Sequence, residues 1–98
     1  MRPPIILKLA VDDIKGIRED LSEFGAYPPK KFRGSFEKFC INVTNMPLMY
    51  SQYEYNVEYR SAVIAYDYIV FYKVDPFDNR VRIYRVLHGK RNIVPMLE

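Results

Sequence analysis

The run EYRSAVIAYDYIVFYKVDPFDNRVRIYRVLH, residues 58–88, decides the fold of this 98-residue chain. It contains three stretches rich in β-branched and aromatic residues, at 58–65, 68–74 and 81–88. The dipeptide Tyr66–Asp67 between the first two is typical of a tight turn, and DPFDNR between the last two has the proline, aspartates and asparagine that favour a loop. The run therefore predicts a three-stranded antiparallel meander.

The last of these strands has apolar residues on both of its faces. Strict alternation gives one set on one face and a second set on the other: Val81, Ile83, Arg85 and Leu87, against Arg82, Tyr84, Val86 and His88. Neither set is cleanly polar, which suits a two-sided strand whose ends approach solvent. Arg85 and His88 are expected on opposite faces, so they are not expected to act together unless the strand bulges.

Two helical patterns precede the meander. In VDDIKGIREDLSEFG, residues 11–25, apolar residues recur at steps of three or four, and Asp12 or Asp13 is expected to cap the first turn. Gly25 is expected to end this helix. The second helix begins near Pro28 and stops at Pro47. The two apolar stripes are Ile14, Ile17, Leu21 and Phe24 in the first helix and Phe32, Phe36, Phe39, Cys40 and Val43 in the second.

The remaining segments complete an α+β architecture. IILKL, residues 5–9, is expected to form an N-terminal strand, and residues 47–56 an irregular connection; the role of residues 47–58 is left open. The order strand, two-helix hairpin, three-strand meander predicts one sheet with the helices on one face, in a single domain spanning residues 1–98. The opposite face, with arginines and tyrosines, is expected to remain open as a binding surface.

Composition narrows the function classes. The net charge of +3 is mildly basic and compatible with an acidic partner or RNA. One histidine and one cysteine, far apart, do not make a metal-ligand set, and no Gly-rich phosphate loop or other cofactor motif is present. Cys40 is expected to be a packed core thiol. The absence of a signal peptide, of a disulfide pair and of a membrane-length apolar run predicts a cytoplasmic protein without a membrane partner.

With metal and cofactor motifs absent from the sequence, a group of basic residues near the C-terminal end is the main candidate for a binding or catalytic site. It consists of Arg82, Arg85, His88, Lys90 and Arg91, with Arg60 on the first meander strand. Arginine binds phosphate through a bidentate fork and histidine titrates near neutrality, so the group could bind an RNA phosphate and support metal-free cleavage through the 2′-hydroxyl. In the other interpretation, these cations are solvated or pair with an acidic partner.

Two stretches resemble the RelE/ParE toxin superfamily of bacterial type II toxin–antitoxin systems. They are LAVDDIKGI, residues 9–17, and the run from YRSAVIAYDYIVFYKV to VRIYRVLHGKRNIVPML, residues 59–97. The resemblance covers nearly the whole chain except residues 47–58. It implies a toxin neutralised by a cognate antitoxin, and contact with operator DNA only through that antitoxin.

The superfamily has two activities, cleavage of mRNA at the ribosome in RelE-like members and inhibition of DNA gyrase in ParE-like members. Of three positions used by RelE-like nucleases, Ile69 and Leu97 depart from the pattern and Arg91 matches it. RVLHGKRN, residues 85–92, looks more like ParE-like members. The resemblance therefore implies a gyrase inhibitor, with a ribosome-dependent mRNA interferase using His88 and Arg91 as the alternative.

The two activities imply different roles for the basic group. In the ParE-like interpretation His88 is a structural residue at the turn around Gly89. The residues expected to contact the target or the antitoxin are then Arg60, Arg82, Arg85, Lys90 and Arg91. In the nuclease interpretation, His88 and Arg91 are the catalytic candidates.

Overall fold

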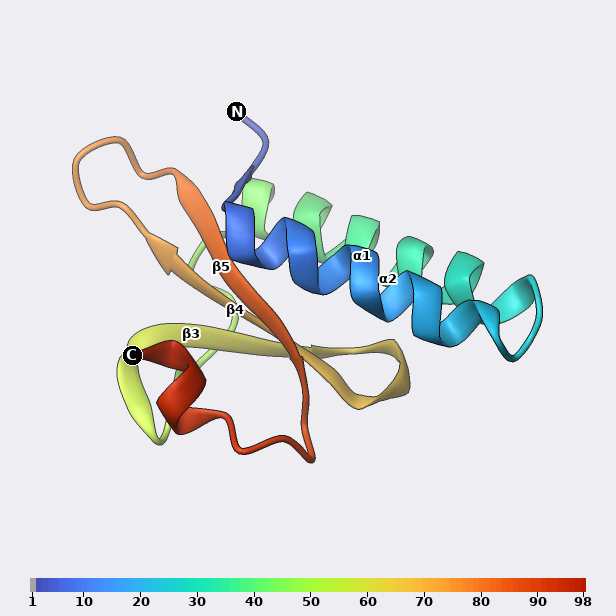
Figure 1. The fold of residues 1–98 in the computed structure, drawn as a ribbon. Coiled ribbons are helices and arrows are strands. Elements are labelled where there is room, and N and C mark those ends of the chain that lie inside the picture. The colour runs from blue at the N-terminus through green and yellow to red at the C-terminus, as the bar shows by residue number, and fades with distance from the viewer. Residues whose placement is uncertain (1) are drawn as a thin grey trace.

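The computed structural model describes residues 2–98 as a helical hairpin packed on one five-stranded sheet (Figure 1). The elements are β1 (Ile5–Ile6), α1 (Lys8–Ser22), α2 (Tyr27–Asn45), β2 (Gln52–Tyr53), β3 (Asn56–Ile64), the 3₁₀ turn η1 (Ala65–Asp67), β4 (Tyr68–Val74), β5 (Val81–His88) and the 3₁₀ turn η2 (Val94–Leu97). The strand order is β1-β5-β4-β3-β2, with β1 parallel to β5 and every other pair antiparallel. The predicted α+β class is confirmed, and the short β2 extends the predicted meander.

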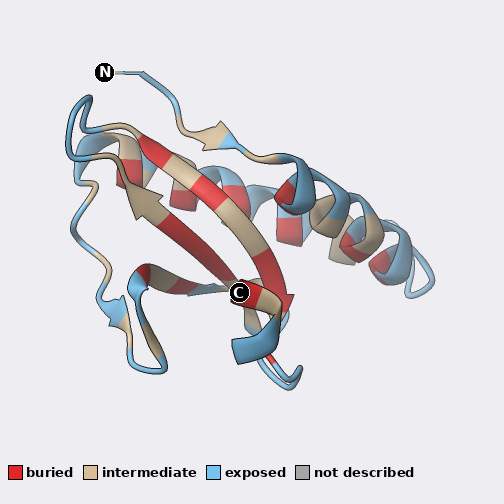
Figure 2. Ribbon diagram, turned by 60° about the vertical axis from the view of Figure 1, so that its left-hand side comes forward, coloured by how far each residue is buried: buried red, intermediate tan, exposed pale blue. Residues whose placement is uncertain are grey.

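The two helices cover one face of the sheet with the predicted stripes. Phe32, Phe36, Phe39 and Val43 of α2 and Ala10, Ile17 and Leu21 of α1 are buried against β3, β4 and β5 (Figure 2). Gly25 has a φ of +108°, the left-handed conformation expected at the end of a helix. The prediction for Phe24 was wrong: its side chain is 76% exposed because α1 ends at Ser22, two residues earlier.

The N-terminal strand is shorter than predicted. Only Ile5 and Ile6 pair with β5, and the helix begins at Lys8 rather than at residue 11. Leu7 connects the strand to the helix: its N–H donates to the Ile83 carbonyl of β5, and its own carbonyl accepts the Val11 N–H of α1, both at 3.0 Å. The helical apolar spacing extends back to the buried Ala10. Asp12 and Asp13 therefore lie inside α1, and the prediction that one of them caps it was wrong; α1 has no side-chain cap.

The tight turn between the first two meander strands is confirmed. Tyr66 and Asp67 have φ values of 60° and 62°. Positive φ at both central residues matches the twist that antiparallel strands require. The Asp67 carbonyl also accepts the Gly89 N–H at 2.9 Å, which ties this turn to the end of β5.

The face of the sheet away from the helices is not open, contrary to expectation. The chain turns back after β5, and Ile93 and Leu97 pack against Tyr59, Phe71 and Leu87 in a second, smaller apolar cluster. The Tyr59 hydroxyl donates to the Leu97 carbonyl at 2.9 Å. Figure 1 shows this C-terminal segment lying in front of β3, on the side opposite the helices. The tail folds back because packing on the sheet removes the apolar side chains of Ile93 and Leu97 from water, which is favourable.

Candidate functional site at the end of β5

A β-bulge in β5 changes which side chains face the helices. Tyr72 of β4 pairs with Ile83, and the next residue, Phe71, pairs with Arg85, so Tyr84 has no opposite residue. The prediction of strict alternation was therefore wrong beyond Ile83. The helix side carries Val81, Ile83, Val86 and His88, and the other side carries Arg82, Tyr84, Arg85 and Leu87. Arg85 and His88 still lie on opposite faces.

Arg85 is held by an ion pair with Asp13 of α1. Its Nε and Nη2 donate to the two carboxylate oxygens at 2.8 and 2.9 Å, and the two side chains are 16% and 14% exposed. Asp13 Oδ2 also accepts the Val86 N–H at 3.0 Å, at the edge of β5 that β1 no longer covers. The hydrogen bonds from Arg85 to Asp13, more than the field of that carboxylate, raise the pKa of Arg85 above its ordinary value. Arg85 Nη1 reaches the Met96 carbonyl at 3.2 Å, so this residue fastens both α1 and the tail to β5.

Two other candidate arginines also make internal contacts. Arg82 pairs with Asp75 at 2.9 Å and with Asp78 at 3.4 Å, across the loop that follows β4. Arg60 lies on the helix side of β3 and donates to the Tyr50 carbonyl at 2.8 Å, which fastens the segment before β2. The structure therefore places Arg60, Arg82 and Arg85 at three different parts of the fold, each with an internal partner, whereas their expected role in binding the target or the antitoxin stays a prediction.

His88 ends β5 beside Tyr68. The imidazole packs edge-on against the Tyr68 ring, with centroids 5.0 Å apart and planes at 89°. Its Nδ1 accepts the Lys90 N–H at 3.2 Å, which in the neutral ring leaves Nε2 as the protonated nitrogen. A Cβ at Gly89 would lie 3.3 Å from the Asp67 carbonyl oxygen, so the turn after His88 favours glycine. His88 thus helps to form this turn.

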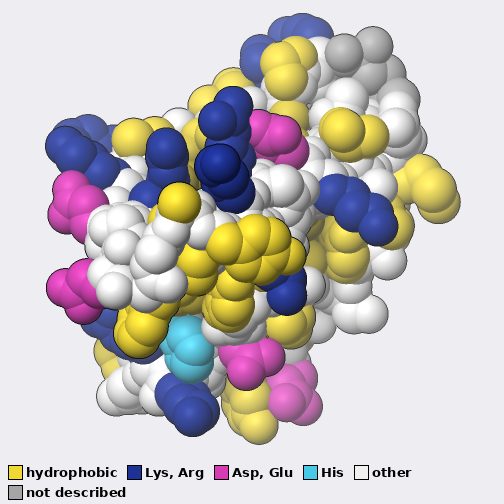
Figure 3. Space-filling view, turned by 90° about the vertical axis from the view of Figure 1, so that its right-hand side faces the viewer, with side chains coloured by type: hydrophobic (Ala, Val, Ile, Leu, Met, Phe, Trp, Pro, Cys, Tyr) yellow, Lys and Arg dark blue, Asp and Glu magenta, His cyan; other side chains and the backbone are white. Residues whose placement is uncertain are grey.

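His88 and Arg91 line one cleft of about 330 Å³ between the end of β5 and α1. The α1 wall contributes Asp12, Asp13 and Asp20, and Tyr68 of β4 also lines the cleft. Partial burial, and secondly the charge of Asp20, raise the pKa of Tyr68. Figure 3 shows the histidine side chain at the surface, with a basic side chain on one side and acidic side chains on the other. Within residues 2–98, neither Lys90 nor Arg91 makes an ion pair, so these two cations remain available to a partner.

The cleft lacks a second cation opposite Arg91. Ile69, at the position where RelE-like nucleases carry an arginine, packs into the second apolar cluster on the other face of the sheet. Leu97, where they use a tyrosine, is buried in the same cluster. The cleft therefore offers one imidazole and one guanidinium, with carboxylates that repel a phosphate on the facing wall.

Other reactive groups add nothing to this cleft. Cys40 lies in α2 against the main core, and its burial, then the nearby Glu37 charge, raise the pKa of the thiol to about 11, so it is protonated at neutral pH. No group of three potential metal-ligating side chains lies together in residues 2–98. No helix in this range is long and apolar enough to cross a membrane.

Sequence reasoning missed Asp13, Asp75 and Asp78 as partners of the arginines. Asp75 and Asp78 lie four to seven residues from Arg82, so charge spacing across the loop could have indicated their pairing. Asp13 lies 72 residues from Arg85, and nothing local in the sequence indicates that contact.

The N-terminal strand, the helical hairpin and the mixed five-stranded sheet form a small α+β domain of the class that the sequence resemblance implied. A comparison with protein families agrees: residues 5–93 match the family described as the ParE toxin of the type II toxin–antitoxin system parDE, and the chain belongs to this family. Membership implies a cognate antitoxin as partner. A search of curated proteins found no match.

Proposed function

We propose that the chain arrests growth by inhibiting DNA gyrase without catalysing a reaction, and that a cognate antitoxin neutralises it in the cytoplasm. The observation that carries the proposal is the family match over residues 5–93. The branch of the superfamily is argued from two positions that RelE-like nucleases use: Ile69 and Leu97 pack in the second apolar cluster and supply neither an arginine nor a tyrosine to the cleft that His88 and Arg91 line.

In this proposal the turn after β5 supplies charge to the target. Lys90 and Arg91 are exposed. The Lys90 N–H donates to His88 Nδ1 and the Arg91 N–H donates to the His88 carbonyl, and these bonds hold the turn that presents the two cations. Arg60, Arg82 and Arg85 support the fold through their internal partners, so their contribution to target or antitoxin binding is indirect.

The test is a supercoiling assay with purified gyrase and relaxed plasmid. Inhibition should titrate with the molar ratio of toxin to gyrase and be reversed by antitoxin. His88→Ala should still inhibit, with no loss beyond that caused by any local unfolding of the turn, whereas Lys90→Glu with Arg91→Glu should need at least ten times more protein. The charge-matched control is Lys30→Glu with Lys38→Glu, two exposed positions on α2. Full supercoiling activity at a large excess of folded toxin would exclude the proposal.

One observation favours the alternative of a ribosome-dependent mRNA interferase: His88 and Arg91 line the same cleft. There the imidazole would exchange a proton with a 2′-hydroxyl and Arg91 would hold the phosphate. This alternative predicts that His88→Ala or Arg91→Ala abolishes mRNA cleavage on translating ribosomes while antitoxin binding persists. Intact mRNA beside wild-type toxin and ribosomes would rule it out.

A further inference from the structure

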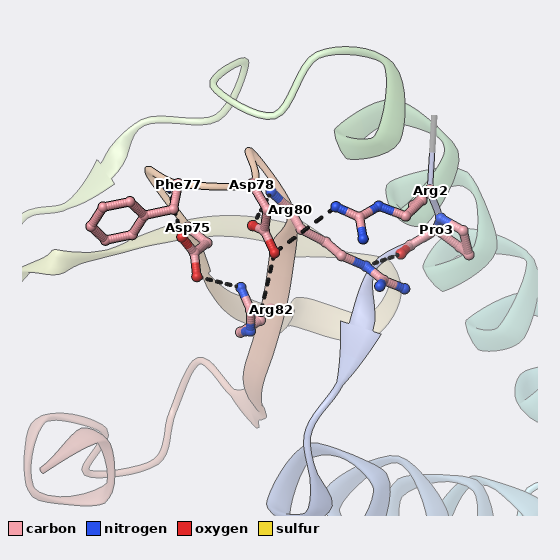
Figure 4. A network of polar contacts seen from close by, with 7 residues as sticks. All are labelled: Arg2, Pro3, Asp75, Phe77, Asp78, Arg80 and Arg82. Atoms are coloured by element: carbon pink, nitrogen blue, oxygen red, sulfur yellow. Dashed lines mark hydrogen bonds and ion pairs between the residues drawn. The ribbon is translucent and has the colours of Figure 1, made fainter.

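The loop between β4 and β5 exposes an aromatic ring that the fold does not use. Phe77 is 98% exposed, although Phe36, Phe39 and Phe71 are buried. Burial of a phenylalanine ring is favourable because it removes apolar surface from water, so a ring left wholly in water is surface available to a partner. Figure 4 shows this ring directed away from the arginines of the loop.

The loop that carries Phe77 is held in one shape. Asp75 Oδ1 accepts the Phe77 N–H at 2.8 Å, and the Asp75 backbone bonds with Asn79 and Arg80 at 2.8 and 2.9 Å. Asp78 Oδ1 accepts the Arg80 N–H at 3.0 Å. Arg82 bridges both carboxylates from below (Figure 4). A ring presented by a rigid loop loses little conformational entropy on binding, which favours affinity.

The surface next to this loop is apolar and adaptable. Met46, Pro47, Leu48 and Met49 line a shallow cleft of about 350 Å³ together with Asn79 of the same loop. Met46 and Leu48 are 61% and 62% exposed. Methionine side chains adjust to varied partner shapes. An exposed aromatic anchor beside such a cleft is the pattern of a protein-binding hot spot rather than of a small-molecule site.

The charge around the loop at residues 75–80, called here the β4–β5 tip, indicates the chemistry of the partner. Three arginines, Arg2, Arg80 and Arg82, face two aspartates, so one positive charge is left over. Arg80 donates from Nε to the Pro3 carbonyl at 3.1 Å and, within residues 2–98, pairs with no carboxylate. A complementary partner would present acidic groups to the arginine side of the loop, beside the apolar pocket that receives the ring.

We propose that the β4–β5 tip docks the toxin onto its target protein, with Phe77 inserted into an apolar pocket and Arg80 facing acidic groups beside that pocket. The inference rests on the proposed function for the identity of that target as gyrase. The tip lies at the far end of β5 from Lys90 and Arg91, so the target would be contacted at two separate places.

The test compares Phe77→Ala with Phe24→Ala, a matched control because Phe24 is also highly exposed, at 76%, in the loop between the helices. Phe77→Ala should raise the concentration for half-inhibition of gyrase at least tenfold, and Arg80→Gln by several-fold at low salt. Phe24→Ala should match the wild type. All three variants should keep wild-type unfolding temperature and antitoxin affinity.

The outcomes separate the two proposals. If the wild type inhibits gyrase and Phe77→Ala inhibits equally, the docking proposal is overturned and the proposed function stands. If the wild type arrests growth without inhibiting gyrase, the proposed function fails, and growth arrest by Phe77→Ala decides the docking role: loss of arrest supports it. Loss of antitoxin affinity in Phe77→Ala with full growth arrest assigns the tip to the antitoxin and overturns the proposal, as does the absence of growth arrest by the wild type.

Discussion

At the scale of single residues, Asp13 does more for the candidate site than any predicted site residue. Its carboxylate binds Arg85 through two nitrogens and also satisfies the Val86 N–H at the uncovered edge of β5. Arg85 in turn holds the Met96 carbonyl. One aspartate therefore joins α1 to the last strand, which form two walls of the cleft that His88 lines, and through Arg85 it also holds the tail.

Replacing Asp13 should destabilise the fold strongly. Asp13→Ala leaves the partly buried Arg85 guanidinium without its partner and the Val86 N–H without an acceptor, at an expected cost of about 3 kcal/mol. Urea unfolding followed by circular dichroism measures this. Asp12→Ala is the control, since Asp12 makes only an exposed pair with Lys8 and its loss should cost under about 0.5 kcal/mol. Equal midpoints for the two variants would contradict the role given to Asp13.

The raised pKa of the Cys40 thiol predicts how the free energy of unfolding changes at alkaline pH. Burial of Cys40, and secondly the charge of Glu37, raise the pKa of its thiol to about 11, above the ordinary 9.0, so the folded state retains the thiol proton more tightly. That contribution is complete below about pH 9 and is lost as the pH rises towards 11. The stability difference between wild type and Cys40→Ala should therefore shrink over this range. Urea unfolding at several pH values tests it, and a constant difference would show that the thiol does not titrate with folding.

At the scale of elements, the bulge in β5 and the tail that follows it set the site. The single extra residue, Tyr84, moves Val86 and His88 to the helix side, where His88 meets Tyr68 and the cleft. The tail then covers the opposite face through η2. The two events give the sheet a core on each face.

Leu97→Ala tests whether the packing of η2 on the sheet stabilises the fold. Leu97 is 6% exposed against Tyr59 and Phe71, so truncation should cost about 2 kcal/mol. Val94→Ala, in the same turn but 37% exposed, should cost much less. Thermal unfolding of the two variants measures the contrast. If Leu97→Ala unfolds at the wild-type temperature, the tail is not bound to the sheet in solution as it is in the structure.

At the scale of the whole molecule, the two apolar clusters share one sheet. Phe71 and Tyr72 are neighbours on β4, both fully buried, yet they belong to clusters on opposite faces. Losing one cluster removes support from the strand that carries the other. The helical hairpin, the sheet and the tail are therefore expected to fold as one unit over residues 1–98.

This coupling predicts one cooperative unfolding transition. The far-ultraviolet signal, dominated by α1 and α2, and tyrosine fluorescence, which includes Tyr59 beneath the tail, should change at the same urea concentration. The measurement is the pair of curves on one sample. A fluorescence change that clearly precedes the loss of helix would mean that the tail detaches on its own.

The sequence by itself determined the element order and most of the core. Apolar spacing in α1 and α2 is set by local geometry, the turn at Tyr66–Asp67 by local backbone chemistry, and the family by motifs along nearly the whole chain. These features depend on neighbours within a few residues, so they can be read from the sequence.

Only the tertiary structure decided which charges are free. Arg85 pairs with an aspartate 72 residues away, and a bulge with no distinctive local sequence moved His88 to the helix side and into the cleft with Arg91. The tail covered a face expected to be open because burial of Ile93 and Leu97 depends on a surface formed by three strands. Contacts of this kind depend on which segments far apart in the sequence pack together. The same packing leaves Lys90, Arg91 and Phe77 exposed.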